Sequence, residues 1–470
     1  MEVMLMREKE EFSEYAKSSL IRISKFAHIL LNVFLQAVCL YYYNTEHNNY
    51  DVGSRRFAMF VVLYAVVLCF SLRTYRAYSF GMSRVTMLVY SQSLSVLIAG
   101  VAFYVVFVIA NSTVFTPLPL IILLAVQFLC NIACTVLINK LYFRLNKPRK
   151  ATVFYTGQAE LIRLRDIAER KKNFSVSGVY EVGDDSFEDI FPKLAGSEVV
   201  LVAGLSSELR NAILQYCLES GKQCYALPCT GDIIMMGAKH MDMFSVPVFS
   251  VSRATLKIEY AVIKRALDII CSLIGIILLS PVMLITALAI ALYDRGPVLY
   301  RQTRLTRGGK EFEILKFRSM RVDAENDGVA RLATDNDDRI TPVGKVIRAC
   351  RLDELPQLFN ILKGDMTVVG PRPERPEIAE QYEQVLPEFN LRLQVKAGLT
   401  GFAQVYGRYN TEPRDKLQMD LMYINRMSLA QDLKLIFATV KILFLKESTH
   451  GTAEGQTTAM AEREKDLTTL

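Results

Sequence analysis

Four long apolar stretches, separated by short polar segments, occupy the first third of the chain. They are Ala27–Tyr43, Phe57–Leu72, Thr86–Ala110 and Val114–Leu137. A helix needs about 20 mostly apolar residues to cross ~30 Å of hydrocarbon, and each stretch reaches or approaches that length. The pattern predicts four transmembrane helices over residues 26–147, after a charged N-terminal lead over residues 1–25. Buried helices of a soluble domain are the alternative, and no cleavable signal peptide is expected in so charged a lead.

Basic residues predict which ends of these helices face the cytoplasm. Lysines and arginines precede the first stretch, lie between the second and third, and follow the fourth, whereas residues 111–119 carry no charge. The excess of basic residues in cytoplasmic loops therefore places the N-terminus, the middle loop and the exit on the cytoplasmic side. Arg55 and Arg56 lie on the predicted outer loop and oppose this orientation.

Strand-like and helical segments alternate over residues 150–255. The strand-like segments are Ala151–Tyr155, Val176–Tyr180, Glu198–Ala203 and Cys224–Leu227, and the helical ones are Glu160–Lys172 and Ser206–Glu219. This alternation predicts a parallel, Rossmann-like α/β domain. Only one glycine, Gly157, follows the first strand, so the dinucleotide-binding fingerprint is absent. A nucleotide-binding role and a structural or regulatory role both stay open.

A fifth apolar run, Ile269–Tyr293, carries Ser280-Pro281 near its centre. Proline removes a backbone donor and kinks or breaks a helix, and a nearby hydroxyl can satisfy the carbonyl that it frees. Basic residues flank both ends of the run, so it lacks the asymmetry of a spanning helix. We expect a re-entrant membrane helix over residues 266–292 that turns back at Ser280 and Pro281. A kinked spanning helix is the alternative.

Composition agrees with a membrane protein that keeps its thiols reduced. Of the 470 residues 51% are hydrophobic, and the net charge of +7 suits anionic lipid or nucleotide partners as well as plain cytoplasmic loops. The nine cysteines include no CxxC spacing and the chain has only four histidines, so a zinc site or a disulfide framework is not expected. The last residues, 448–470, are polar and are predicted to be a disordered tail.

Two adjacent carboxylates, Asp353 and Glu354, stand in the segment RLDELPQLFNILKGDMTVVGPRPE, with Arg348 shortly before it. Cations beside paired carboxylates suit a site that handles phosphates and a divalent metal. The alternative is a helix cap, because Asp and Glu with Pro356 close behind are common in a first helical turn.

Six motifs occur in one order: Ser280-Pro281, KFRSM, LDELPQLFN, LKGDM, VGPRPE and GLTGFAQV followed by Gly407-Arg408. Over residues 260–446 the chain closely resembles the monotopic bacterial polyprenyl-phosphate phosphoglycosyl transferases, which start exopolysaccharide, capsule and O-antigen units. The preceding four helices and α/β module resemble the large members of that family. The resemblance implies a mostly α-helical α+β catalytic domain over residues 256–447.

The resemblance also implies the activity and the site. The family transfers a sugar-1-phosphate from a UDP-sugar to undecaprenyl phosphate and releases UMP. Asp353 is implied as the nucleophile and Glu354 as a ligand of Mg²⁺. The basic residues of the motifs, implied as substrate-binding, are Lys316, Arg318, Arg348, Arg372 and Arg408. Each could instead be a surface cation or part of a structural ion pair.

Two positions depart from the family pattern, and two more cations have open roles. Thr306 stands where the family often has glycine in its R-x-G-x-x-G-K stretch, and Arg351 replaces a small hydroxyl residue. The first departure concerns the shape of that loop. Lys264 and Arg265 precede the fifth apolar run, where they either contact the lipid phosphate or extend their charged ends toward the membrane surface.

The residue types suit the implied chemistry. A diphosphate donor repels an anionic nucleophile, so a metal and guanidinium groups must neutralise it. A carboxylate can form an acyl-phosphate intermediate and split the transfer into two steps. In a first helical turn Asp353 and Glu354 would point about 100° apart, one toward phosphorus and one toward the metal. Arg372 lies between two prolines on a stiff backbone, which suits bidentate phosphate recognition.

The expected partners are the UDP-sugar donor, the undecaprenyl phosphate acceptor and the lipid bilayer. A homodimer is considered, and no nucleic acid is expected. The expected location is the bacterial inner membrane, with the catalytic domain facing the cytoplasm. UDP-glucose is slightly favoured over UDP-galactose by family frequency. A non-catalytic membrane scaffold for polysaccharide assembly is the alternative from another class.

Overall fold

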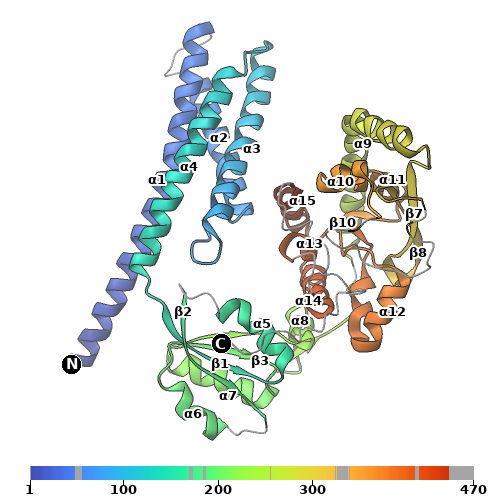
Figure 1. The fold of residues 1–470 in the computed structure, drawn as a ribbon. Coiled ribbons are helices and arrows are strands. Elements are labelled where there is room, and N and C mark those ends of the chain that lie inside the picture. Colours follow the sequence, from blue (N-terminus) through green and yellow to red (C-terminus); the bar gives the residue numbers. More distant parts are fainter. Residues whose placement is uncertain are drawn as a thin grey trace. The chain divides into compact units, whose positions relative to one another are not determined.

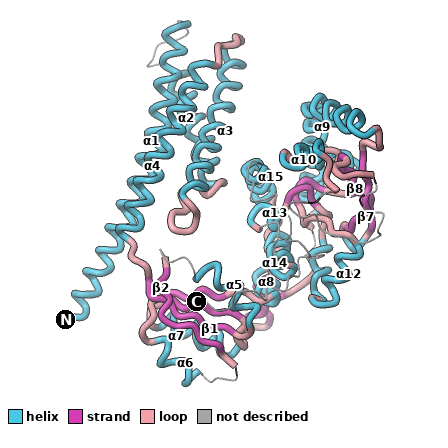
Figure 2. The backbone as a smooth tube through the Cα atoms, in the orientation of Figure 1, coloured by secondary structure: helices cyan, strands magenta, loops and turns pink. Residues whose placement is uncertain are grey.

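The computed structural model describes residues 2–47, 55–168, 173–183, 187–254, 256–322, 324, 337, 339–407 and 412–443. The chain divides into two compact units, Met1–Pro228 and Cys229–Leu470 (Figures 1 and 2). This boundary falls inside residues 150–255, the range predicted for one α/β domain. Arg408 and the predicted tail over residues 448–470 lie outside the described residues. The other predicted domain limits stay predictions.

Four long helices begin the first unit and coincide with the four apolar stretches. They are α1 (Glu2–His47), α2 (Arg55–Thr74), α3 (Val85–Asn111) and α4 (Leu118–Leu145). Helix α1 begins well before its apolar part and includes most of the predicted N-terminal lead. Its sequence has neither proline nor glycine and is rich in strong helix formers, so nothing interrupts it. We call α1–α4 the four-helix block.

The four-helix block has an aromatic and aliphatic core, with apolar side chains also covering its outside. Phe60, Tyr64, Phe103 and Phe107 are buried in this core, and the rings of Phe103 and Phe107 stack 5.5 Å apart. Among the described residues five helices, α1–α4 and α9 of the second unit, are long and apolar enough to cross a membrane. This composition is typical of a membrane protein.

A four-stranded parallel sheet completes the first unit, with strand order β2-β1-β3-β4. Its elements are β1 (Arg149–Tyr155), α5 (Gln158–Ala168), β2 (Phe174–Glu181), α6 (Phe187–Leu194), β3 (Val199–Ala203), α7 (Ser207–Glu219) and β4 (Gln223–Ala226). Side chains of α6 and α7 pack with Phe154, Val200 and Val202, whereas Leu164 of α5 packs with Val153 and Leu201. The helices therefore cover opposite faces. Helix α6 was not predicted, because Pro192 inside it argues against a helix.

The second unit begins with a short helix and a hairpin and continues with the long helix α9. These elements are α8 (Thr230–Met236), β5 (Lys239–Met243), β6 (Val246–Ser250) and α9 (Ile258–Asp294). Ile233 of α8 is buried in the same apolar core as Phe389, Leu417 and Leu435. This contact explains why part of the range predicted for the α/β domain groups with the second unit.

The remaining elements of the second unit are small sheets and short helices (Figure 1). They are β7 (Leu299–Leu305), η1 (Arg307–Gly309), β8 (Glu311–Phe317), α10 (Pro342–Ala349), η2 (Leu352–Glu354), α11 (Gln357–Lys363), β9 (Thr367–Val369), α12 (Pro376–Val385), η3 (Pro387–Gln394), β10 (Gly398–Thr400), α13 (Phe402–Tyr406), α14 (Pro413–Ile424) and α15 (Leu429–Leu443). Strands β7 and β8 are antiparallel, and β9 and β10 are parallel.

Helix α9 is one helical run, so Pro281 does not interrupt it as an element. Pro281 cannot donate to the carbonyl of Ile277, and the Ser280 hydroxyl donates to that carbonyl instead, at 2.8 Å. Both ends of α9 contact the same unit: Arg265 bonds the Ile361 carbonyl and Asp294 pairs with Arg318. A straight helix would separate these ends by about 44 Å. Figure 1 shows the ribbon changing direction along α9.

Candidate active site

Asp353 and Glu354 lie in the 3₁₀ turn η2, between α10 and α11. The prediction that they open an α-helix is wrong, because α11 begins only at Gln357, with Pro356 at its cap. Arg351 has a left-handed backbone, with φ of 53°, so the chain changes direction after α10. Successive residues of a 3₁₀ turn point about 120° apart. The two carboxylates therefore diverge somewhat more than the predicted helix would allow.

The Glu354 carboxylate is held by an arginine from the loop after β9. Arg372 Nη2 lies 2.8 Å from Glu354 Oε1, and Arg351 Nη1 lies 3.9 Å from Oε2. Burial alone would raise the pKa of Glu354, but the charges of Arg372, Lys316 and Arg351 outweigh it and lower that pKa to about 2. Glu354 is therefore ionised throughout the neutral range.

Asp353 titrates differently from its neighbour. Burial, together with the adjacent charge of Glu354, raises the pKa of Asp353 to about 6, although Lys316, Arg348 and Arg372 oppose this shift. Lys316 lies near the C-terminal end of β8, and burial lowers its pKa to about 8 against the attraction of the two carboxylates. Near neutral pH the site thus presents two carboxylates and a protonated lysine.

The structure brings some of the predicted cations to the dyad and not others. Lys316, Arg348 at the end of α10 and Arg372 act electrostatically on Asp353. Arg318 is buried in an ion pair with Asp294 at the end of α9. That contact is structural, so a role of Arg318 in substrate binding stays a prediction. Arg408 lies outside the described residues.

Lys264 and Arg265 have structural partners rather than free charged ends. Lys264 Nζ lies 2.7 Å from Asp432 Oδ2 and donates to the Val369 carbonyl at 2.9 Å. Arg265 donates to the Ile361 and Leu362 carbonyls at 2.7 and 2.8 Å. These contacts tie α9 to β9, α15 and the C-terminal end of α11. These contacts do not support an extension of the two side chains toward the membrane surface. They also use the N–H donors that would bind a lipid phosphate.

A buried charge cluster that was not predicted supports the loop of Arg372. Arg392 is 2% exposed, lies 2.7 Å from Asp420 Oδ2 and donates to the Arg372 carbonyl at 2.8 Å. Glu374 pairs with Arg392 and Lys416. Asp420 is 1% exposed. In the sequence, only the position of Asp420 among the apolar residues of LQMDLMYI could have indicated that it is buried.

The loop around Thr306 forms without glycine at that position. Thr306 has an extended backbone, with φ of −125°, which any residue can adopt. Its hydroxyl donates to the Asp365 carbonyl at 2.9 Å and accepts from the Ala397 amide at 3.2 Å. The left-handed positions of the loop are Gly308 and Gly309, with φ of 74° and 78°. The departure at Thr306 therefore leaves the turn intact.

The dyad suits a magnesium ion that arrives with the substrate. No group of three histidine, cysteine, aspartate or glutamate side chains that could hold a metal ion occurs in the described part of the chain. Mg²⁺, however, is commonly bound by one or two carboxylates together with substrate phosphates and waters. Glu354, whose carboxylate stays ionised, fits this pattern as an oxygen donor beside a diphosphate.

Comparison with known proteins decides the family. The family model of bacterial sugar transferases matches residues 259–446, from the first turn of α9 to just beyond α15. A UDP-glucose:undecaprenyl-phosphate glucose-1-phosphate transferase of Caulobacter vibrioides is 43% identical over 192 residues, which are 40% of this chain and 72% of that protein. The chain belongs to the bacterial sugar transferase family. The expectation drawn from the six motifs is confirmed.

Two other relatives of this bacterial sugar transferase match over a smaller share of their length. A UDP-N-acetylgalactosamine-undecaprenyl-phosphate N-acetylgalactosaminephosphotransferase of Aeromonas hydrophila is 44% identical over 187 residues, 39% of this chain and 44% of that protein. A UDP-glucose:undecaprenyl-phosphate glucose-1-phosphate transferase of Escherichia coli is 43% identical over 204 residues, 42% of this chain and 44% of that protein. The chain thus spans less than half the length of these two relatives.

Proposed function

We propose that this bacterial sugar transferase moves a sugar-1-phosphate from a UDP-sugar to undecaprenyl phosphate and releases UMP, as the first membrane step of exopolysaccharide, capsule or O-antigen synthesis. The observation that carries the proposal is the dyad of Asp353 and Glu354 with Arg372 bound to Glu354 at 2.8 Å. Paired carboxylates next to a guanidinium and a lysine suit attack on a charged diphosphate. The names of the relatives support the same reaction class.

The proposed reaction has two balanced displacements at one phosphorus atom. First, an Asp353 carboxylate oxygen bonds to the sugar-bearing phosphorus of the UDP-sugar, the bond from that phosphorus to the bridging oxygen breaks, and UMP leaves. Second, a phosphate oxygen of undecaprenyl phosphate bonds to the same phosphorus, and the bond to Asp353 breaks. The carboxylate is restored, and the lipid carries the sugar on a diphosphate. Covalent catalysis of this kind replaces one difficult step with two easier ones.

The cations around the dyad have separate proposed tasks. Arg372 and Lys316 neutralise the phosphates of the donor, and Arg348 adds positive charge beside Asp353. Mg²⁺, when bound by Glu354 and the donor phosphates, would supply further neutralisation of the leaving UMP. Glu354 suits this task because its low pKa keeps it ionised.

For the membrane arrangement we propose that α1–α4 span the bacterial inner membrane. We further propose that α9 is re-entrant over residues 266–292, with the catalytic domain facing the cytoplasm, where UDP-sugars are found. The hydroxyl of Ser280 on the carbonyl freed by Pro281 supports a turn inside the apolar helix. The parallel sheet is proposed as a Rossmann-like module, and the homodimer stays a prediction.

UMP release from a panel of UDP-sugars tests the reaction and the choice of sugar together. We expect the purified full chain to release UMP with undecaprenyl phosphate present, with UDP-glucose slightly favoured over UDP-galactose and UDP-N-acetylgalactosamine. Asp353→Asn is the inactive control, because it keeps the shape of the side chain and removes the nucleophile. No UMP from any donor, with a folded protein in lipid, would leave the scaffold role as the better account.

A further inference from the structure

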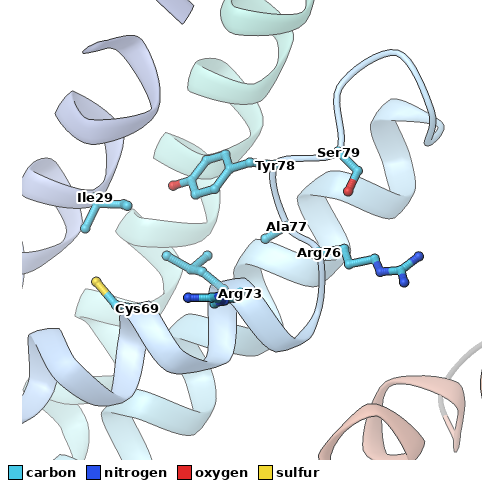
Figure 3. A pocket seen from close by; sticks show the side chains of 8 residues that line it. Ile29, Cys69, Arg73, Arg76, Ala77, Tyr78 and Ser79 are labelled. Carbon is cyan, nitrogen blue, oxygen red and sulfur yellow. The ribbon is translucent and has the colours of Figure 1, made fainter. Parts of the chain in front are cut away.

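A pocket of about 300 Å³ lies in the four-helix block where α2 ends (Figure 3). Residues of α1, of α2 and of the loop after α2 line it, among them Ile29, Leu72, Arg73, Arg76, Tyr78 and Ser79. The reaction proposed above uses none of these residues. The pocket combines an apolar wall with cations at the end of a helix long enough to cross a membrane. This combination suits a molecule with an apolar body and an anionic group.

Arg73 supplies the available positive charge. It is exposed, and its guanidinium has no hydrogen-bond or ion-pair partner among the residues that the structure describes. Figure 3 shows the guanidinium of Arg76 extending away from Tyr78. A cation without a protein partner beside an apolar wall favours a phosphate, which a guanidinium can bind in bidentate geometry.

The tyrosine of the pocket presents an acceptor, as the hydrogen bonds behind it show. Asn32 Nδ2 donates to the His28 carbonyl at 3.0 Å and to Asn131 Oδ1 at 3.3 Å, so Asn131 turns its oxygen toward His28. His28 Nε2, 2.9 Å from that oxygen, must therefore carry the proton. In a neutral imidazole Nδ1 is then an acceptor. The Tyr78 hydroxyl, 2.9 Å from Nδ1, donates to it and leaves only lone pairs for a ligand.

We propose that this pocket binds the headgroup of an anionic phospholipid that carries a free hydroxyl, such as phosphatidylglycerol. Its phosphate pairs with Arg73, and a headgroup hydroxyl donates to the Tyr78 oxygen. Its acyl chains follow the exposed apolar side chains next to the pocket, Phe26 and Leu30 on α1 and Val66 and Phe70 on α2. A free phosphate would lack those apolar contacts, and undecaprenyl phosphate would lack the hydroxyl.

Native mass spectrometry of the full chain with competing lipids tests the proposal. From an equal mixture we expect phosphatidylglycerol to be retained over phosphatidylcholine, over phosphatidic acid and over undecaprenyl phosphate. Arg73→Gln should lower retention of phosphatidylglycerol roughly tenfold, the effect of one hydrogen bond to a charged group. Arg144→Gln is the matched control, because Arg144 is an exposed arginine in the last turn of α4, outside the pocket.

Tyr78→Phe separates the hydroxyl contact from the charge contact. It should remove the preference for phosphatidylglycerol over phosphatidic acid and keep the preference for both over phosphatidylcholine. Thermal melting shows whether each variant is folded. If Tyr78→Phe is unfolded, Arg73→Gln still tests the proposal, because Arg73 is exposed and its replacement should not disturb the fold. Equal retention by wild type and Arg73→Gln would overturn the proposal, as would undecaprenyl phosphate replacing phosphatidylglycerol. Neither outcome depends on transferase activity.

Discussion

At the scale of single residues, the neighbours of each carboxylate decide its chemistry. Glu354 keeps its charge because Arg372 bonds it directly, whereas Asp353 is half-buried beside that charge, and its pKa is raised to about 6. A nucleophile needs to be ionised but not bound by a cation, and a metal ligand needs to stay ionised. The surroundings therefore suit Asp353 to attack and Glu354 to hold the metal.

The pH dependence of the rate follows from these two groups and Lys316. In the proposed mechanism Asp353 attacks only above about pH 6, where it is ionised, and Lys316 loses its charge above about pH 8. We expect UMP release to rise through pH 6 and fall through pH 8. Lys316→Arg should remove the alkaline limb, because arginine stays charged. A flat profile between pH 5 and 9 would contradict these assignments.

Arg372 should matter to the rate far more than an exposed arginine away from the dyad. Arg372→Gln removes a cation from the dyad and should lower UMP release about a hundredfold, as loss of one transition-state donor does. Arg301→Gln is the matched control, because Arg301 is exposed on β7 and pairs only loosely with Glu313, at 3.5 Å. Similar rates for the two variants would show that Arg372 is structural.

The sequence predicted the residues of the site that follow one another closely in the chain. Asp353, Glu354 and Arg372 stand in one motif segment, and the structure joins Arg372 to Glu354. The partners of Arg392 could not be predicted, because a buried ion pair leaves no local pattern and Asp420 lies 28 positions away. The partner of Lys264 could not be predicted for the same reason, since Asp432 is 168 positions away.

At the scale of elements, apolar periodicity and turn residues predicted the helices and strands that depend on residues close together in the sequence. Helices α2 and α3 and the strands of the sheet have close to the predicted bounds, whereas α1 begins well before its apolar stretch and α4 extends beyond the end of its own. The 3₁₀ turn of the dyad was not predicted, because the residue types around Arg351 do not indicate that its backbone is left-handed. The loop of Arg372 is likewise positioned by a distant element, through Arg392 on η3.

Arg392 should be essential for stability through its ion pairs, and for activity through its separate hydrogen bond to the Arg372 carbonyl. Arg392→Met leaves the buried Asp420 without its ion-pair partner and Glu374 paired with Lys416 alone, which should cost about 3–5 kcal/mol of unfolding free energy. Adding Asp420→Leu removes one unpaired charge and should raise the melting temperature again. We expect activity to stay low in the double variant, because the Arg372 carbonyl still lacks its donor. Recovery of activity together with stability would show that Arg392 serves folding alone.

At the scale of the whole molecule, the side on which α9 leaves the membrane determines where the dyad lies. In the proposed topology four spans return the chain to the cytoplasm, and a fifth would carry Asp353 away from the proposed UDP-sugar donor. Structural contacts hold both ends of α9 to one unit, through Arg265 and Asp294. A re-entrant α9 satisfies both requirements.

Labelling of single cysteines tests this topology. In a cysteine-depleted chain, cysteines at Glu259 and Gly296, before and after most of α9, should react with an impermeant thiol reagent from the same side. Replacing Ser280 and Pro281 with Ala and Leu removes the hydroxyl and the break in hydrogen bonding, so the helix should straighten and activity should fall. Reaction of the two cysteines from opposite sides would end the re-entrant model.

The covalent role of Asp353 is the central claim, and mass spectrometry of the protein incubated with UDP-sugar but no lipid acceptor tests it most directly. We expect a sugar-phosphate adduct on the peptide that contains Asp353, formed together with UMP and discharged when undecaprenyl phosphate is added. Asp353→Asn should form no adduct while keeping its fold. Turnover by the wild type without any adduct, with kinetics that require donor and acceptor to be bound together, would contradict the account.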